Sequence, residues 1–101
     1  APPHFLEELS MNTTAIVTVV GPDRVGIIAE VCRTLADLGL NVLEISQTIM
    51  SGMFTMIMRV QPTAATPDFE TVRARLDGKG AEMGLSVRIQ REDIFDAMHT
   101  V

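Results

Sequence analysis

The sequence predicts an α+β fold: one domain with a four-stranded antiparallel sheet and two helices packed on one of its faces. Two observations predict this fold. Apolar strand-like runs and amphipathic helical stripes follow one another in the order strand, helix, strand, strand, helix, strand. The two middle strands are separated only by Ser51-Gly52, a pair that is typical of a tight hairpin turn.

The first strand and the first helix are joined by a glycine-flanked turn. Residues 14–20 are β-branched and almost continuously apolar, as expected of a central strand. A helix is predicted over residues 27–38, and its buried stripe is Ile28, Val31, Leu35 and Leu38. Gly39 follows as the residue that ends the helix in a left-handed conformation.

Residues 42–50 and 53–60 form the predicted hairpin. If Met50 pairs with Met53, one face pairs Ile49 with Phe54, Gln47 with Met56, Ile45 with Met58, and Leu43 with Val60. The other face pairs Thr48 with Thr55, Ser46 with Ile57, and Glu44 with Arg59. Because threonine pairs and opposite charges are favourable across strands, we expect this register, with the first face in the core. Gln47 would be the only polar residue there and would need a partner, at a helix end, across a dimer or in a ligand.

The remaining chain predicts a helix, a strand and a tail. We expect Thr66 to cap the helix and Pro67 to occupy its first position. Gly78 and Gly80 weaken its second half, where it could break, and Gly84 ends it. The buried stripe of this helix is Phe69, Val72, Leu76 and Met83; the fourth strand buries Leu85, Val87 and Ile89; and the tail over residues 92–99 is a short helix with Ile94, Phe95 and Met98 on one face.

This order of elements, with right-handed crossovers, predicts the ferredoxin-like βαββαβ sandwich plus a short C-terminal helix. The second and fourth strands are then the edges of the sheet. The face away from the helices would carry Val42, Met50, Met53 and Ile57. An apolar open face and an unpaired edge strand both favour a homodimer or a higher even oligomer.

The composition excludes several classes of function. A formal net charge of −5 and the absence of Trp and Tyr argue against nucleic acid and anionic membranes as partners. The single Cys32 fits a reducing cytoplasm and is expected to be a buried, inert thiol. Neither a metal cluster nor a nucleophile–base pair is evident, so we expect no cofactor and no catalysis. Residues 1–10 form a loose arm or an expression remnant, and residues 11–101 form the domain.

The turn over residues 21–26 (Gly-Pro-Asp-Arg-Val-Gly) is the most informative motif. A glycine-flanked turn that begins a helix leaves backbone amides without partners, and such amides favour an anion. Asp23 either caps the helix or receives the ammonium of a ligand. Arg24 either holds a carboxylate or is solvated. Asn41 either contacts a ligand or supports the turn after Gly39.

These residues resemble an ACT domain, a small ligand-binding module of amino-acid metabolism. The resemblance rests on the strand 16–20, the turn 21–27, the Leu-Gly-Leu-Asn-Val step at 38–42, and the strings at 45–48, 54–56 and 94–98. The last three strings resemble the stand-alone single-ACT bacterial proteins of the UPF0237 family. The resemblance covers residues 11–101 and is stronger for fold than for function.

The resemblance implies a ligand site between two side-by-side subunits. By motif position it marks Asp23, Arg24, Val25 and Gly26 in the turn, together with Asn41, Val42 and Leu43 at the start of the second strand. ACT domains usually regulate an attached enzyme. This chain carries no attached catalytic domain, so its target would be a separate metabolic enzyme or regulator.

Two functions follow as hypotheses. The first is a non-catalytic regulatory homodimer that binds a small amino acid or a related carboxylate. The second is an interaction module without a small-molecule ligand, which docks a partner through its apolar outer face and its tail. The methionines at positions 50, 53, 56 and 58 would pack in the core or the dimer, or else line an adaptable pocket.

Overall fold

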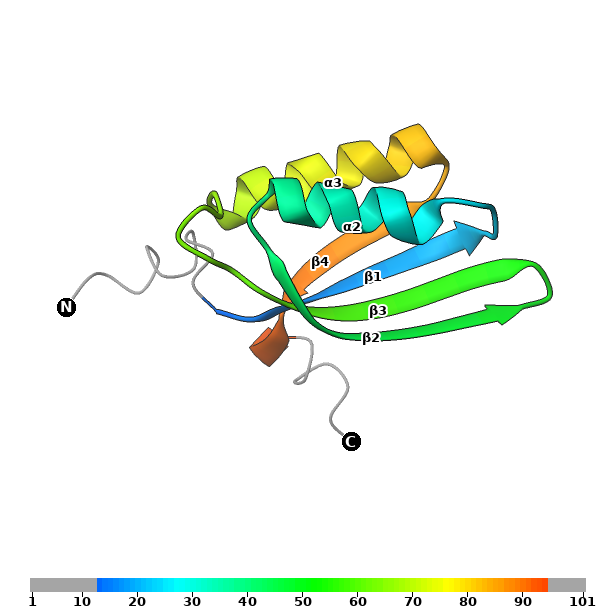
Figure 1. Cartoon of the computed structure of the whole chain (residues 1–101), viewed down its shortest axis with the longest axis horizontal. Coiled ribbons are helices and arrows are strands. Elements are labelled where there is room, and N and C mark those ends of the chain that lie inside the picture. Colours follow the sequence, from blue (N-terminus) through cyan, green and yellow to red (C-terminus); the bar gives the residue numbers. More distant parts are fainter. Residues whose placement is uncertain (1–12, 95–101) are drawn as a thin grey trace.

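A computed structural model describes residues 13–94 and confirms the predicted plan. The elements are β1 (Ala15–Pro22), α2 (Ile27–Asp37), β2 (Asn41–Met50), β3 (Met53–Gln61), α3 (Phe69–Met83) and β4 (Ser86–Arg91). The four strands lie in the order β2-β3-β1-β4, every pair is antiparallel, and both helices cover the same face of the sheet (Figure 1). The predicted arm and most of the predicted C-terminal helix lie outside the described residues.

The hydrophobic core lies between the two helices and the central strands. β1 and β3 contribute Val17, Val19, Met56 and Met58, α2 contributes Ile27, Val31 and Leu35, and α3 contributes Val72 and Leu76, all of which are buried. Ile28, predicted to be buried, is instead 39% exposed. The helix begins at Ile27, as predicted, but Ile27 takes the core position expected of Ile28, because it lies four residues before the buried Val31 on the same face.

The loop between β3 and α3 corrects the predicted helix cap. The hydroxyls of Thr63 and Thr66 both donate to the carbonyl of Gly39, at 2.6 and 2.9 Å. Gly39 ends the α2 segment with φ 74, as predicted. Because the Thr66 hydroxyl is used in this contact, Asp68 caps α3 instead and accepts from the backbone N–H of Thr71. Pro67 therefore precedes the cap.

α3 runs without a break through its two internal glycines, contrary to the expected weakness. Gly80 has a packing reason, because a Cβ atom there would lie 2.8 Å from the carbonyl oxygen of Leu85 and 3.0 Å from Val87. Close approach of α3 to β4 therefore requires glycine at this position. A Cβ atom on Gly78 would meet nothing within 4 Å.

The hairpin has the predicted register over most of its length. Ser51 and Gly52 have φ 53 and 78, positive values of the kind that hairpin turns use. The register changes near the start of β2, where Val42 instead of Leu43 lies opposite Val60. Leu43 is the extra residue of a β-bulge, and a bulge moves the residue before it to the other face of the strand. Val42 therefore packs against the core, and its predicted place on the open face is wrong.

β2 is an edge strand that the helices leave uncovered. Met56 and Met58 of β3 are fully buried, whereas their neighbours on β2, Gln47 and Ile45, are exposed. Ile45 is 48% exposed and Ile49 is 54% exposed. The predicted core face is thus buried on β3 only, and Gln47 lies in solvent. The helices cover the centre of the sheet and stop short of this edge (Figure 1).

Candidate functional site

The turn between β1 and α2 forms one candidate site, at one end of the sheet. The backbone N–H of Asp23 donates to the carbonyl of Gly52 at 2.9 Å, which fixes the turn against the hairpin tip. Gly26 is the N-cap of α2, with φ 92, and no side chain caps the helix. The carbonyl of Gly26 accepts from Glu30 N at 3.0 Å. The first amides of α2 are thus left without a side-chain acceptor, as an anion site requires.

Asp23 does not cap the helix, so the capping interpretation is wrong. The left-handed Gly26 occupies the cap position, and no side chain accepts a hydrogen bond from the start of the helix. Asp23 is exposed. A carboxylate at the surface beside free amides is available to a positively charged group of a ligand.

The other turn residues are exposed and weakly engaged. Arg24 lies 3.9 Å from the Glu30 carboxylate, and both side chains are about half exposed. An exposed ion pair at this distance contributes little to stability, so the Arg24 guanidinium is free to exchange partners. Val25 is 96% exposed, so its apolar side chain is open to contact with a ligand or a second chain.

The structure does not bring the two predicted halves of the site together within one chain. Pro22, next to the turn, pairs with Met53 at the hairpin end of β3. Asn41 pairs with Gln61 at the opposite end of the same strand. The turn and the start of β2 therefore lie at opposite ends of the sheet. Asn41 is exposed, Val42 is half-buried and Leu43 is 37% exposed.

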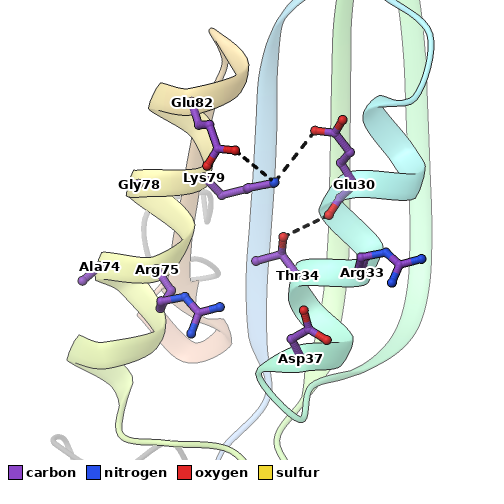
Figure 2. Close-up of a pocket in the computed structure, with 9 residues that line it drawn as sticks. All are labelled: Glu30, Arg33, Thr34, Asp37, Ala74, Arg75, Gly78, Lys79 and Glu82. Carbon is purple, nitrogen blue, oxygen red and sulfur yellow. Dashed lines mark hydrogen bonds and ion pairs between the residues drawn. The ribbon is translucent and has the colours of Figure 1, made fainter.

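A hollow between the two helices escaped the sequence analysis. It has a volume of about 450 Å³ and lies on the outer face of α2 and α3 (Figure 2). Its lining combines small residues with both signs of charge: Glu30, Arg33, Thr34, Asp37, Ala74, Arg75, Gly78, Lys79 and Glu82. The helical glycine at 78 was the available signal, but spacing alone could not show which residues of another helix would face it.

Beneath the sheet, a charged cluster joins the end of β4 to its neighbours. The Glu92 carboxylate accepts from Arg59 Nε at 2.7 Å and from the hydroxyl of Thr14. Arg59 also lies 3.6 Å from Glu44, the cross-strand pair that the sequence predicted. The hydrogen bond from Thr14, followed by the bond from Arg59, lowers the pKa of Glu92 below its ordinary value. This cluster fixes where the chain leaves the sheet.

Three further findings concern the single cysteine, metal ligands and membrane-spanning helices. Cys32 is half-buried and packs against the core. Residues 13–94 contain no group of three or more His, Cys, Asp and Glu side chains that could hold a metal ion. Within the same range, no helix is long and apolar enough to cross a membrane.

This fold places the chain in a class, the small domains built on a βαββαβ sandwich with both helices on one face of the sheet. The family model described as ACT domain matches residues 13–90, which include nearly all of the sheet and both helices. Among solved structures, the chain is similar to an ACT domain protein from Streptococcus pneumoniae, with 38% identity and a TM-score of 0.74, over 83% of this chain and 94% of that one.

Curated relatives place the chain more narrowly. A UPF0237 protein of Lactococcus lactis is 51% identical over 84% of this chain and 95% of its own length. A UPF0237 protein of Methanocaldococcus jannaschii is 45% identical over 85% of this chain and 96% of its own length. The chain belongs to the ACT domain family and, within it, to the UPF0237 proteins.

The family fixes the general class of function. ACT domains are generally regulatory, bind amino-acid ligands and form dimers. The regulatory subunit of aspartate kinase from Thermus thermophilus shows the same fold, with 25% identity and a TM-score of 0.59, over 81% of this chain and 52% of that subunit. The UPF0237 names assign neither a ligand nor a target.

Proposed function

We propose that this chain is a non-catalytic regulatory module that works as a homodimer and binds a small amino acid or a related carboxylate at the subunit junction. The observation that carries the proposal is the separation of the turn from Asn41 to opposite ends of one sheet. A site that uses both groups needs two chains. A separate metabolic enzyme or regulator would be the target of the module.

The exposed edge of β2 supplies the means of bringing two chains together. An edge strand offers a row of unpaired N–H and C=O groups to a second copy. If β2 pairs antiparallel with β2 of a partner about a two-fold axis, the start of one strand meets the end of the other. Asn41 then approaches Met50 of the partner subunit, beside the hairpin tip to which the turn is bonded.

The chemistry of the joined groups suits an amino-acid zwitterion. The free amides at the start of α2 and the Arg24 guanidinium favour its carboxylate. Asp23 favours its ammonium group, and Asn41 of the other subunit supplies both a donor and an acceptor. Apolar contacts would come from Val25, Val42 and Leu43, of which Val25 is 96% exposed.

Ligand contact with both subunits would couple binding to the geometry of the dimer. A ligand that binds one arrangement of the two subunits more tightly shifts the population towards it. The same difference in free energy would change the affinity of the dimer for its target, which is the form that regulation takes without catalysis.

A thermal-shift screen of the full chain against the proteinogenic amino acids tests the proposal. A ligand present at 100 times its Kd should add about 2.7 kcal/mol of stability, which is several degrees for a domain of this size. Asp23→Ala and Asn41→Ala should each abolish the shift in a folded dimer, whereas Asp77→Ala, on the outer surface of α3, should preserve it. Unchanged binding in both site variants would refute this choice of residues.

The alternative function is an interaction module without a small-molecule ligand. The exposed apolar side chains of Met53, Ile57 and Ile94 favour it, because they lie at the hairpin, on the open face of the sheet and beyond its last strand. On this hypothesis a chain truncated after Arg91 loses association with its partner. A truncated chain that keeps the same assembly would count against the alternative.

A further inference from the structure

From the hollow between α2 and α3 we infer a second binding site, within one subunit, for a small zwitterion whose carboxylate meets Arg75 and whose ammonium meets Asp37. This site does not depend on the junction site proposed above. Figure 2 shows that Arg75 reaches from α3 towards α2, and that Asp37 lies at the same end of the hollow on the opposite helix.

The hollow exists because the residues at its centre are small. Ala74 and Gly78 line it from α3, and Thr34 lines it from α2. Thr34 is 7% exposed and donates its hydroxyl to the carbonyl of Glu30 at 3.0 Å, so this hydroxyl is already paired. The centre of the hollow therefore offers space, and the polar chemistry lies at its two ends.

The glycine at position 78 supports the inference that a molecule occupies the hollow. A glycine inside a helix lowers stability relative to alanine. At Gly80 close packing against β4 explains the cost, whereas a Cβ atom on Gly78 would meet nothing within 4 Å. Among residues 13–94, packing gives no reason for glycine at position 78. A molecule that enters the hollow would give one.

The charges at the two ends differ in whether they are already paired. At one end Lys79 lies 4.0 Å from Glu30 and 3.6 Å from Glu82, so its ammonium is balanced by carboxylates. At the other end Arg75 and Asp37 take part in no ion pair in the part of the chain that the structure describes. They carry opposite charges on facing helices, yet the hollow keeps them apart.

A small zwitterion matches this arrangement better than a simple ion. An anion would pair with Arg75 but would meet the repulsion of Asp37, and a cation would meet the reverse. A molecule that carries both groups satisfies both side chains, and an arginine can hold a carboxylate through two parallel hydrogen bonds. Arg33 also lines the hollow, but its guanidinium points away from α3 (Figure 2).

An NMR titration of the full chain with 4-aminobutyrate tests the inference, with propionate and propylamine as single-charge comparisons. We expect saturable amide shifts at Thr34 and Gly78 with 4-aminobutyrate, and none that saturate with the other two probes. Arg75→Ala and Asp37→Asn should each raise Kd about tenfold or more, because each removes a charged hydrogen bond. Arg73→Ala is the matched control, since Arg73 lies on the same helix but does not line the hollow and pairs with Glu70 and Asp77.

Gly78→Leu separates binding from folding. Its Cβ atom has free space and leucine favours helix, so the variant should be at least as stable as the natural chain while its side chain fills the hollow. Loss of the titration in this variant, with binding retained in Asp23→Ala, would support the site. Shifts confined to the turn over residues 23–26, equal responses to all three probes, or no saturation with 4-aminobutyrate would each overturn it.

Discussion

The backbone N–H of Asp23 donates to the carbonyl of Gly52 at 2.9 Å, and this bond joins the turn between β1 and α2 to the tip of the β2–β3 hairpin. Asp23 and Gly52 lie almost 30 residues apart in the sequence. The bond places the proposed ligand residues at the end of the edge strand through which a second chain would pair. In the proposed dimer, this short stretch of backbone would therefore couple ligand binding to the geometry of the two subunits.

The hairpin tip should depend on glycine at one of its two positions. Gly52 has φ 78, and a β-branched residue is strained at such an angle, so Gly52→Val should lower the free energy of unfolding by about 1–2 kcal/mol. Ser51→Asn is the control, because asparagine tolerates the left-handed conformation that Ser51 already adopts at φ 53. Urea unfolding of both variants measures the difference. Equal stability of the two variants would contradict this account of the turn.

The two internal glycines of α3 should respond in opposite directions to alanine. Gly78→Ala should raise the free energy of unfolding by about 0.5–1 kcal/mol, because it adds helix propensity in open space. Gly80→Ala should lower it by about 1–3 kcal/mol, because the new methyl group would overlap Leu85 and Val87. Chemical denaturation of both variants measures the two changes in the free energy of unfolding. A loss of stability in Gly78→Ala would refute the inference that a Cβ atom at position 78 has open space.

Local signals account for most of what the sequence predicted correctly. The Ser51-Gly52 turn, the end of the α2 segment at Gly39, and the end of α3 at Gly84 each depend on the conformational preference of a few neighbouring residues. The alternation of apolar and polar residues in β4 is also local, and its buried residues follow it, whereas the buried residues of β3 follow from the hairpin register that the turn sets.

The errors came from contacts between distant segments. Thr66 would cap α3, but its hydroxyl binds the carbonyl of Gly39, 27 residues away. The bulge at Leu43 has no marker in the sequence of β2. Exposure of Ile45 follows from how far the helices extend over the sheet, which is a property of the whole fold. The separation of the turn from Asn41 likewise required the sheet register.

The proposed dimer should depend on the edge of β2 and not on the open face of the sheet. Ile45 lies on the exposed edge strand, on the side that faces the helices, and Ile57 lies on the open face, 40% exposed. Ile45→Lys should raise the dimer Kd about tenfold or more, because it places like charges near a two-fold axis. Ile57→Lys should leave the dimer intact. The reverse result in sedimentation experiments would indicate face-to-face packing of two sheets.

The Glu92 cluster predicts a pH-dependent contribution to stability. The pKa of Glu92 lies below its ordinary value of 4.5 in the folded chain, chiefly through the hydrogen bond from Thr14 and then through Arg59. The folded state therefore binds its proton less readily than the unfolded state does, and the contribution is present above pH 4.5 and is lost as pH falls through the folded pKa.

Glu92→Gln isolates this contribution. The Tm of the variant should fall below that of the natural chain near neutral pH, and the gap should close as the solution is acidified below pH 4.5. Asp93→Asn provides the control, because Asp93 is 68% exposed and pairs with Arg91, two residues away and outside the Glu92 cluster. A gap that stays constant with pH would mean that packing, and not the charge of Glu92, stabilises the end of β4.

A mixing experiment tests whether the ligand site takes residues from two chains. Asp23→Ala and Asn41→Ala homodimers should each lack intact sites. In a mixed dimer one junction carries both substitutions and the other carries neither, so random exchange of subunits should restore about a quarter of the sites of the natural dimer. Calorimetric titration of the mixture with the amino acid found in the screen measures that stoichiometry. If both residues served a site within one chain, mixing would restore no sites, because every chain would still carry one defect.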